Sequence, residues 1–347
     1  MSKDSLIVAP HERILVTGAG GFIGSRVVAG LLSRSFNNLV GFARPGSKLS
    51  HEANGVSKRV EFERFQGNLL SREDCESACK DVVVVYHLAA GTGSKSYPEA
   101  FLNSVVTTRN LLDACVGSSS VRRFVLVSSF VVYTNRQRAR LLDESCPIER
   151  HPESRGEAYC YAKVKQEEMV KEYGENFGIP YVVIRPGSVY GPGQEGITGR
   201  VGIGTFGLFL HMGGGNKIPF TYVDNCADAI VLAGLVKGID GEAFNVVDDD
   251  LPSSRKFLRQ CKNARHFKSF YVPHAVSYSL SFLWEKYSEW SKGQLPPAFN
   301  RGHWHANWKR TRYSNNKLKQ RLGWSPRVST AEGMRRYFAG FGRGNYA

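Results

Sequence analysis

A glycine-rich turn near the N-terminus is the feature that most constrains how this chain can fold. An apolar run over residues 14–16 leads into the turn, which reads Thr17-Gly18-Ala19-Gly20-Gly21-Phe22-Ile23-Gly24. Apolar residues then recur at helical spacing over residues 22–32. The pattern predicts a strand, a tight turn and a helix, as in the first unit of a dinucleotide-binding sheet.

The three spaced glycines have separate roles in such a unit. Gly18 would allow the tight turn, Gly21 would let the backbone approach a pyrophosphate, and Gly24 would let the helix pack close to the strand. The helix N-terminus would then offer free N–H groups and a partial positive charge to the phosphates. Because a turn before any helix can show the same spacing, the glycines alone do not identify a dinucleotide site, and further residues along the chain must support it.

Apolar strands alternate with helical patterns along most of the chain. Strands are predicted over residues 39–43, 60–65, 82–87, 124–127, 181–185 and 240–247, and helices over residues 71–80, 97–115, 159–173 and 226–236. This alternation predicts an α/β fold with a Rossmann-type, doubly wound parallel sheet. Ligands of such sheets bind beyond the carboxyl ends of the strands, where suitable residues recur: Arg44, Asn68, Leu69, Leu88, Ala89, Ala90, Ser128 and Ser129.

The residues after the second predicted strand bear on the choice of cofactor. An acid at this place would bind the ribose hydroxyls of NAD, whereas Arg44, with Ser47 and Lys48, could surround a 2′-phosphate. We therefore expect NADP as the preferred cofactor and NAD as the alternative.

Tyr159 and Lys163 are four residues apart in a predicted helix and so share one face. A tyrosine with a pKa of about 10 is a poor base at neutral pH, and a nearby ammonium lowers that pKa. The pair therefore predicts a general acid or base that acts on a hydroxyl or carbonyl group.

The order of the motifs resembles that of the extended short-chain dehydrogenase/reductase family, with its epimerase/dehydratase and 3β-hydroxysteroid dehydrogenase-like branches. The resemblance runs from about residue 12 to the end of the chain. It rests on the glycine turn, His87-Leu88-Ala89-Ala90, Val127-Ser128-Ser129 with Val132-Tyr133, Tyr159-x-x-x-Lys163, Arg185-Pro186-Gly187 with Val189-Tyr190-Gly191-Pro192, Tyr222-Val223-Asp224-Asn225 and Leu322-Gly323-Trp324-Ser325-Pro326.

The resemblance implies roles for particular residues. Tyr159 would be the acid/base, Lys163 would lower its pKa and bond the nicotinamide ribose, and Ser129 rather than Ser128 would bond the reacting oxygen. Asn103 would support the lysine through water. The implied cofactor-binding residues are Thr17, Gly18, Gly21, Phe22, Ile23, Gly24, Arg44, Lys48, Asn68, Leu69, Leu88, Ala89, Ala90, Tyr159, Lys163, Pro186, Gly187 and Val189.

Two residues depart from the family pattern. Asn68 stands where the family often has Asp, and Thr134 replaces the usual glycine after Val132-Tyr133.

The resemblance also divides the chain into two parts. Residues 10–186 and 220–250 would form the dinucleotide-binding Rossmann domain, and residues 187–219 and 251–341 a smaller, mixed substrate-binding lobe. All five tryptophans lie in this lobe, where they either form its core or, at Trp304 or Trp308, flank a substrate.

Charge and composition limit the partners. The net charge is +15, and residues 301–347 contain eleven Lys or Arg residues and one acid, Glu332. Aromatic residues interrupt this basic stretch, so we expect a folded face rather than a nucleic-acid arm; it would favour an anionic substrate or surface, or simply be solvated. The amphipathic segment from Leu280 to Trp290 leaves open a role at a membrane surface, without stable insertion.

The seven cysteines match no zinc spacing and His303-x-His305 lacks further ligands, so free thiols and no metal site are expected. With neither a signal peptide nor a membrane-spanning run, we expect a cytoplasmic protein.

Three functions remain open. The first is an NAD(P)-dependent enzyme that transfers a hydride to or from a carbonyl or hydroxyl carbon of a small molecule, with Tyr159 as acid/base. Residues 44–47, 222–225 and 272–273 favour it, because they resemble reductases and 3β-hydroxysteroid dehydrogenases. The second is a nucleotide-sugar epimerase or dehydratase that retains NAD. The third is a non-catalytic NADP-binding sensor or scaffold, against which the set Ser129, Tyr159 and Lys163 argues.

The family resemblance also implies a homodimer, formed through the helices near residues 97–115 and 159–173.

Overall fold

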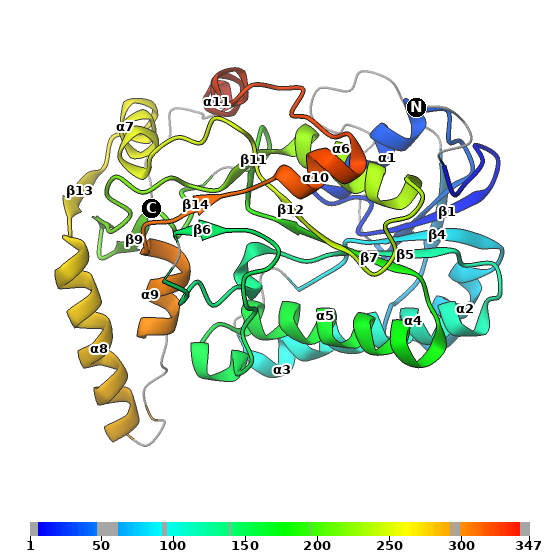
Figure 1. Cartoon of the computed structure of the whole chain (residues 1–347), viewed down its shortest axis with the longest axis horizontal. Helices are drawn as coiled ribbons and strands as arrows, with labels where there is room; N and C mark the ends of the chain where they lie inside the picture. The colour runs from blue at the N-terminus through cyan, green and yellow to red at the C-terminus, as the bar shows by residue number, and fades with distance from the viewer. Residues whose placement is uncertain are drawn as a thin grey trace.

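A seven-stranded parallel sheet forms the centre of the molecule (Figure 1). The computed structural model describes residues 6–46, 62–91, 96–138, 140–194, 196–291, 294 and 299–340. The strand order is β12-β7-β5-β4-β1-β2-β3. The strands are β1 Arg13–Thr17, β2 Leu39–Ala43, β3 Glu63–Gln66, β4 Val82–His87, β5 Arg123–Val127, β7 Tyr181–Pro186 and β12 Ala243–Val246.

Helices cover both faces of this sheet (Figure 1). Strands β4 and β5 are buried along their whole length, as expected for parallel strands between two layers of helices. On one face lie α1 Gly24–Leu32, α6 Val223–Leu235 and α10 Asn316–Leu322, and on the other lie α2 Arg72–Cys79, α4 Thr107–Gly117 and α5 Ala158–Phe177. The predicted Rossmann-type, doubly wound fold is confirmed.

The sheet reverses its direction of winding at β1. This strand pairs with β2 on one side and with β4 on the other, so the crossovers leave it in opposite directions. A crevice opens at the carboxyl end of the sheet where the order reverses, and ligands of this fold bind there. The glycine turn lies in that place, directly after Thr17.

The helix predicted over residues 97–115 is not regular. It comprises α3 Tyr97–Ala100, a π-helical segment Phe101–Val106 and α4 Thr107–Gly117. The Thr107 and Thr108 hydroxyls donate to the backbone carbonyls of Asn103 and Ser104, at 3.1 and 2.6 Å. Such side-chain bonds compete with the backbone ladder, and π-turns of this kind often mark functional sites.

Three short strands within residues 188–211 were not predicted from the sequence. Strands β8 Ser188–Tyr190 and β11 Phe220–Tyr222 pair in parallel. A hairpin of β9 Gly202–Thr205 and β10 Leu208–His211 forms a small sheet with β13 Lys268–Tyr271. The hairpin turn has positive φ at Phe206 and Gly207, the backbone that tight two-residue turns need.

The remaining elements lie mostly to one side of the sheet. They are β6 Leu141–Leu142, α7 Ser254–Ala264, α8 His274–Trp290, α9 Arg301–Trp308, β14 Arg312–Tyr313 and α11 Thr330–Ala339. Trp308 is fully buried, and the Trp304 indole donates to Ser277 on α8. Both tryptophans therefore serve packing, as the core interpretation expected.

Part of the C-terminal stretch completes the core of the sheet. Leu318, Leu322 and Trp324 pack in the same buried cluster as α1 and α6. The sequence placed residues 251–341 in the substrate-binding lobe. These three residues pack with the Rossmann sheet instead, so the predicted division does not follow the packing at this point. The division into a cofactor domain and a substrate lobe otherwise stays a prediction.

The basic C-terminal stretch is largely paired. Glu242 bonds both Lys317 and Arg321, and Asp249 bonds Lys319. The acid Glu332 bonds Arg335 and Arg336. Exposed ion pairs of this kind stabilise little, and they leave less free charge for a partner than the count of residues suggests.

The seven cysteines are all free thiols, six of them buried. In the part of the chain that the structure describes, no helix is both long and apolar enough to cross a membrane.

Candidate active site

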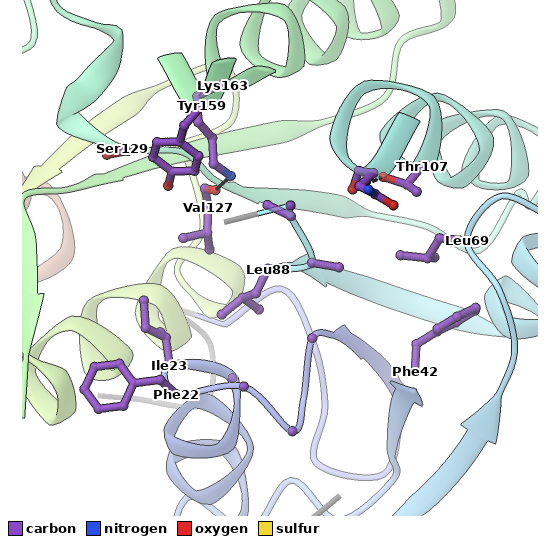
Figure 2. Close-up of a pocket in the computed structure, with 18 of the residues that line it drawn as sticks. Phe22, Ile23, Phe42, Leu69, Leu88, Thr107, Val127, Ser129, Tyr159 and Lys163 are labelled. Atoms are coloured by element: carbon purple, nitrogen blue, oxygen red, sulfur yellow. Dashed lines mark hydrogen bonds between the residues drawn. The ribbon is translucent and has the colours of Figure 1, made fainter. Parts of the chain in front are cut away.

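A cavity of about 1060 Å³ follows the carboxyl ends of the parallel strands. Figure 2 shows Tyr159, Lys163 and Ser129 at one end of it, Leu88 near the middle, and Phe42 and Leu69 at the other end. The residues predicted for the site that line this cavity are Gly18, Gly21, Phe22, Ile23, Gly24, Arg44, Asn68, Leu69, Leu88, Ala89, Ala90, Asn103, Ser129, Tyr159, Lys163, Pro186, Gly187 and Val189.

The glycine turn brings backbone to the cavity wall. Gly18 has φ +69°, which favours glycine. A Cβ on Gly24 would lie 2.0 Å from the Gly18 carbonyl oxygen, so only glycine lets α1 start this close to β1. No side chain caps the N-terminus of α1, and its first turn contains no acid. Its free N–H groups and partial positive charge suit the pyrophosphate of a dinucleotide.

Thr17 does not line the cavity, contrary to its predicted role in cofactor binding. Its side chain is fully buried, and its hydroxyl accepts a hydrogen bond from the Ala89 N–H at 3.1 Å. His87 Nδ1 lies 2.8 Å from the same hydroxyl, and His87 Nε2 lies 2.9 Å from Thr108 Oγ1. Burial lowers the pKa of His87 to about 3, so its ring is neutral. Thr17 therefore fixes the glycine turn to β4 and α4.

Arg44 and Asn68 lie at the cavity end opposite the tyrosine. Arg44 is exposed directly after β2, where the fold places the adenosine ribose. The Asn68 side-chain oxygen accepts a hydrogen bond from the Leu70 N–H at 3.0 Å, which turns it toward its own loop. Ser47 and Lys48, predicted to join Arg44, lie outside the described residues.

Tyr159 and Lys163 project from the first turns of α5 into the cavity (Figure 2). The Lys163 ammonium lies 5.9 Å from the centre of the Tyr159 ring and donates to the Val127 carbonyl at 2.7 Å. Burial lowers the pKa of Lys163 to about 8, while the Glu167 carboxylate acts in the opposite direction.

The expected lowering of the Tyr159 pKa is not observed. Burial raises this pKa to about 12, and only the Ser129 side chain opposes the effect. Desolvation of the phenolate therefore decides the direction of the shift. The phenol keeps its proton at neutral pH, which suits a proton donor better than a base.

The two adjacent serines face different partners. The Ser129 side chain acts to lower the pKa of Tyr159, and it caps the short helix Phe130–Val132 by accepting from the Val131 N–H at 3.3 Å. Ser128 instead donates to the buried Glu167 carboxylate. This geometry supports Ser129 as the serine that would meet a reacting oxygen.

Glu167 and Arg185 form a buried ion pair behind the site. Arg185 Nη2 lies 2.6 Å from Glu167 Oε2, and both side chains are less than a tenth exposed. Arg185 Nη1 also donates to the Tyr133 hydroxyl at 2.8 Å, which donates to Asn245 Oδ1 at 2.8 Å. The pair connects α5, which bears Tyr159 and Lys163, to strand β7 of the sheet.

Several lining residues were missed from the sequence. Thr107 lies one helical turn after Asn103, on the same side, and that spacing could have revealed it. Phe42 and Ala43 are the last residues of β2, directly before Arg44, which was predicted to bind the cofactor. Gly193 and Gln194 sit in a glycine-rich stretch without a pattern that separates them from their neighbours. The other missed residues are Gly20, Leu70, Gly91, Glu99 and Val127.

These residues fit a dinucleotide. The cavity is lined by the uncapped N-terminus of α1 and by the glycine turn, whose close backbone contact a Cβ on Gly24 would prevent. Tyr159 and Lys163, the proton-transfer pair, line the same cavity. Comparison with known sequences agrees, because the model of the NAD dependent epimerase/dehydratase family matches residues 14–246. The chain belongs to this family and is an NAD-dependent enzyme of the dehydrogenase/reductase or epimerase/dehydratase kind.

Individual relatives differ in their named activities. An uncharacterized UDP-glucose epimerase, YtcB, of Bacillus subtilis is 30% identical over 67% of this chain and 76% of its own. Isoform 1 of the Arabidopsis thaliana 3beta-hydroxysteroid-dehydrogenase/decarboxylase is 25% identical over 94% of this chain and 79% of its own. The solved UDP-glucose 4-epimerase of Thermus thermophilus, in complex with NAD, shares the fold with a TM-score of 0.68 and 23% identity, covering 95% and 98% of the two chains.

Proposed function

We propose that this protein is an NADP-dependent reductase or dehydrogenase that interconverts a carbonyl and a hydroxyl group of a small molecule. The observation that carries the proposal is the position of Tyr159, which lies with Ser129 and Lys163 in the cavity that the glycine turn lines. The bound nicotinamide would supply the hydride acceptor or donor. The chain itself would hold the substrate oxygen and move the proton.

Tyr159 would donate its proton to the carbonyl oxygen during reduction and take it back during oxidation. Since burial raises the pKa of Tyr159 to about 12, the proton that reduction requires is present at neutral pH. Ser129 would hold the oxygen beside the phenol. Lys163, fixed by the Val127 carbonyl, would face the nicotinamide ribose, and Asn103 would support it through water.

Arg44 supports the preference for NADP. A guanidinium after the second strand binds a 2′-phosphate and lacks the acceptor oxygens with which an acid holds the ribose hydroxyls of NAD. The relative named as a hydroxysteroid dehydrogenase aligns with nearly the whole chain, substrate lobe included, which supports an alcohol or ketone as substrate.

A nucleotide-sugar epimerase or dehydratase with retained NAD is the second candidate. It is supported by the relative that is 30% identical and named as a UDP-glucose epimerase. A cofactor-binding sensor or scaffold is the third. The homodimer and the cytoplasmic location stay predictions.

The cofactor content of freshly purified protein separates these candidates. We expect no tightly held nucleotide after denaturation, and at least tenfold tighter binding of NADPH than of NADH, or about 1.4 kcal/mol. Arg44→Ala should remove this preference, whereas Arg64→Ala, on the edge strand β3, should keep it. NAD that survives purification would contradict the proposal and favour the epimerase.

A further inference from the structure

Helix α8 has the reverse of the usual polarity for a surface helix. Its buried side consists of small polar residues, Ser277, Ser281 and Ser288. The Ser277 hydroxyl accepts a hydrogen bond from the Trp304 indole at 2.9 Å, and Ser281 donates to the Ser277 carbonyl at 2.8 Å. Helices of soluble domains normally bury their apolar face, so packing among the described residues does not explain why α8 exposes residues such as Leu283 and Trp290.

Those large residues form one exposed stripe along the helix. Leu283 is 60% exposed and Trp290 is 75% exposed. The Tyr287 and Trp290 rings stack on each other with centroids 5.7 Å apart. We call this surface the apolar stripe; its members, at helical spacing, are Val276, Leu280, Leu283, Trp284, Tyr287 and Trp290.

The strand that precedes α8 also exposes apolar residues. Phe270 and Tyr271, at the end of β13, are 65% and 43% exposed, and β13 is an edge strand of its small sheet. Figure 1 shows α7, β13 and α8 following one another along the left edge of the molecule. Large exposed apolar residues gathered along one edge in this way mark an interaction site.

Basic residues border the same edge. Arg255 lies over the Tyr271 ring at 6.0 Å, and the Lys262 ammonium donates to Ser269 of β13 at 3.2 Å. We call this surface the basic flank; its exposed members are Arg255, Lys256, Arg259, Lys262 and Lys268.

Few acids offset this charge. Residues 251–291 contain seven Lys or Arg residues but only two acids, Glu285 and Glu289. Glu285 is paired with Arg301, and Glu289 with Lys286, each at 2.7 Å. The edge therefore combines an apolar, aromatic surface with a net positive border.

We propose that the apolar stripe and the basic flank bind the surface of an anionic lipid bilayer, with α8 lying in the interface. Tyrosine and tryptophan rings favour the boundary between headgroups and acyl chains, where one side is apolar and the other wet. Lysine and arginine beside them are attracted to anionic headgroups by about 1 kcal/mol each. A second copy of the chain fits less well, because a symmetric contact would bring two basic flanks together.

Vesicle flotation with the full-length protein tests the proposal. The vesicles contain either phosphatidylcholine alone or equal parts of phosphatidylcholine and phosphatidylglycerol. We expect the protein to float with the anionic vesicles, to float much less with the neutral ones, and to be released progressively as salt is added. Protein that stays at the bottom with both kinds of vesicle would overturn the proposal.

Two pairs of substitutions at exposed positions separate the two components. Leu283→Ser with Trp290→Ser should weaken partitioning about a hundredfold, and Lys262→Glu with Lys268→Glu should weaken it about a hundredfold on anionic vesicles only. Phe177→Ser and Lys171→Glu, at exposed positions of α5, are the matched controls and should bind as the parent does.

Cofactor binding and thermal unfolding confirm that each variant is folded. If the stripe variant floats as well as the parent, the apolar stripe has no role and the proposal fails. Sedimentation could instead show that the parent protein is a dimer and the stripe variant a monomer. If the parent also does not bind vesicles, the surface is an interface between copies of the chain.

Discussion

At the scale of single residues, the proposed chemistry depends on one phenol group. Tyr159→Phe removes only the hydroxyl, so the fold and the cofactor cavity should stay intact. We expect the turnover number to fall by about 10²- to 10⁴-fold, the range for loss of a general acid. Steady-state kinetics and an NADPH titration measure the two effects separately. Tyr161→Phe, two residues further along the same helix, is the control. Full activity of Tyr159→Phe would contradict the role of Tyr159 as the acid/base.

Lys163 makes the stability of the fold depend on pH. Its pKa falls from 10.5 to about 8 on burial, so between these pH values the unfolded chain binds the proton and the folded chain does not. Stability therefore rises with pH across this window, by up to about 3 kcal/mol from this group. Denaturant unfolding of Lys163→Met at pH 8 and pH 10 should show this rise removed. Lys171→Met, exposed on the same helix, should keep it; an unchanged rise in Lys163→Met would show that the buried amine is not its source.

At the scale of elements, the ion pair between α5 and β7 fixes the proton-transfer helix to the sheet. Glu167→Gln leaves the Arg185 guanidinium buried without its counter-charge, so we expect a loss of about 3–5 kcal/mol in the free energy of unfolding. Its neighbour Glu168 bonds Lys165 at the surface, and Glu168→Gln should cost less than about 1 kcal/mol. Urea unfolding of both variants checks this; equal losses would contradict a special role for the buried pair.

At the scale of the whole molecule, the C-terminal stretch is part of the core. Trp324 is 2% exposed, and its indole donates to the Asn225 carbonyl at 3.1 Å. Trp324→Ala should cost about 3–5 kcal/mol through the cavity and the lost hydrogen bond. The exposed Trp290→Ala should change the unfolding midpoint little. If both variants unfold alike, the C-terminal stretch does not close the core.

Much of the fold could be predicted because its signals are local. The apolar runs of β1 and β4 and the glycine turn act within a few residues, and so does the cap of α2, where the Ser71 hydroxyl accepts from the Asp74 N–H. The π-helical segment Phe101–Val106 depends on hydroxyl-to-backbone bonds that compete with the regular helix. The hairpin β9–β10 depends on pairing with β13, about sixty residues later, which local periodicity does not encode.

The sequence by itself determined the parallel α/β class, the glycine turn and the residue types that gather at the strand ends, because spacing along the chain encodes them. Only the tertiary structure decided that Thr17 supports the turn from behind, that Ser129 and not Ser128 faces Tyr159, and that burial raises the tyrosine pKa. It also decided that α8 turns its serines inward and its aromatic residues outward. Each of these depends on which distant segments exclude water from a side chain, and that is a property of packing.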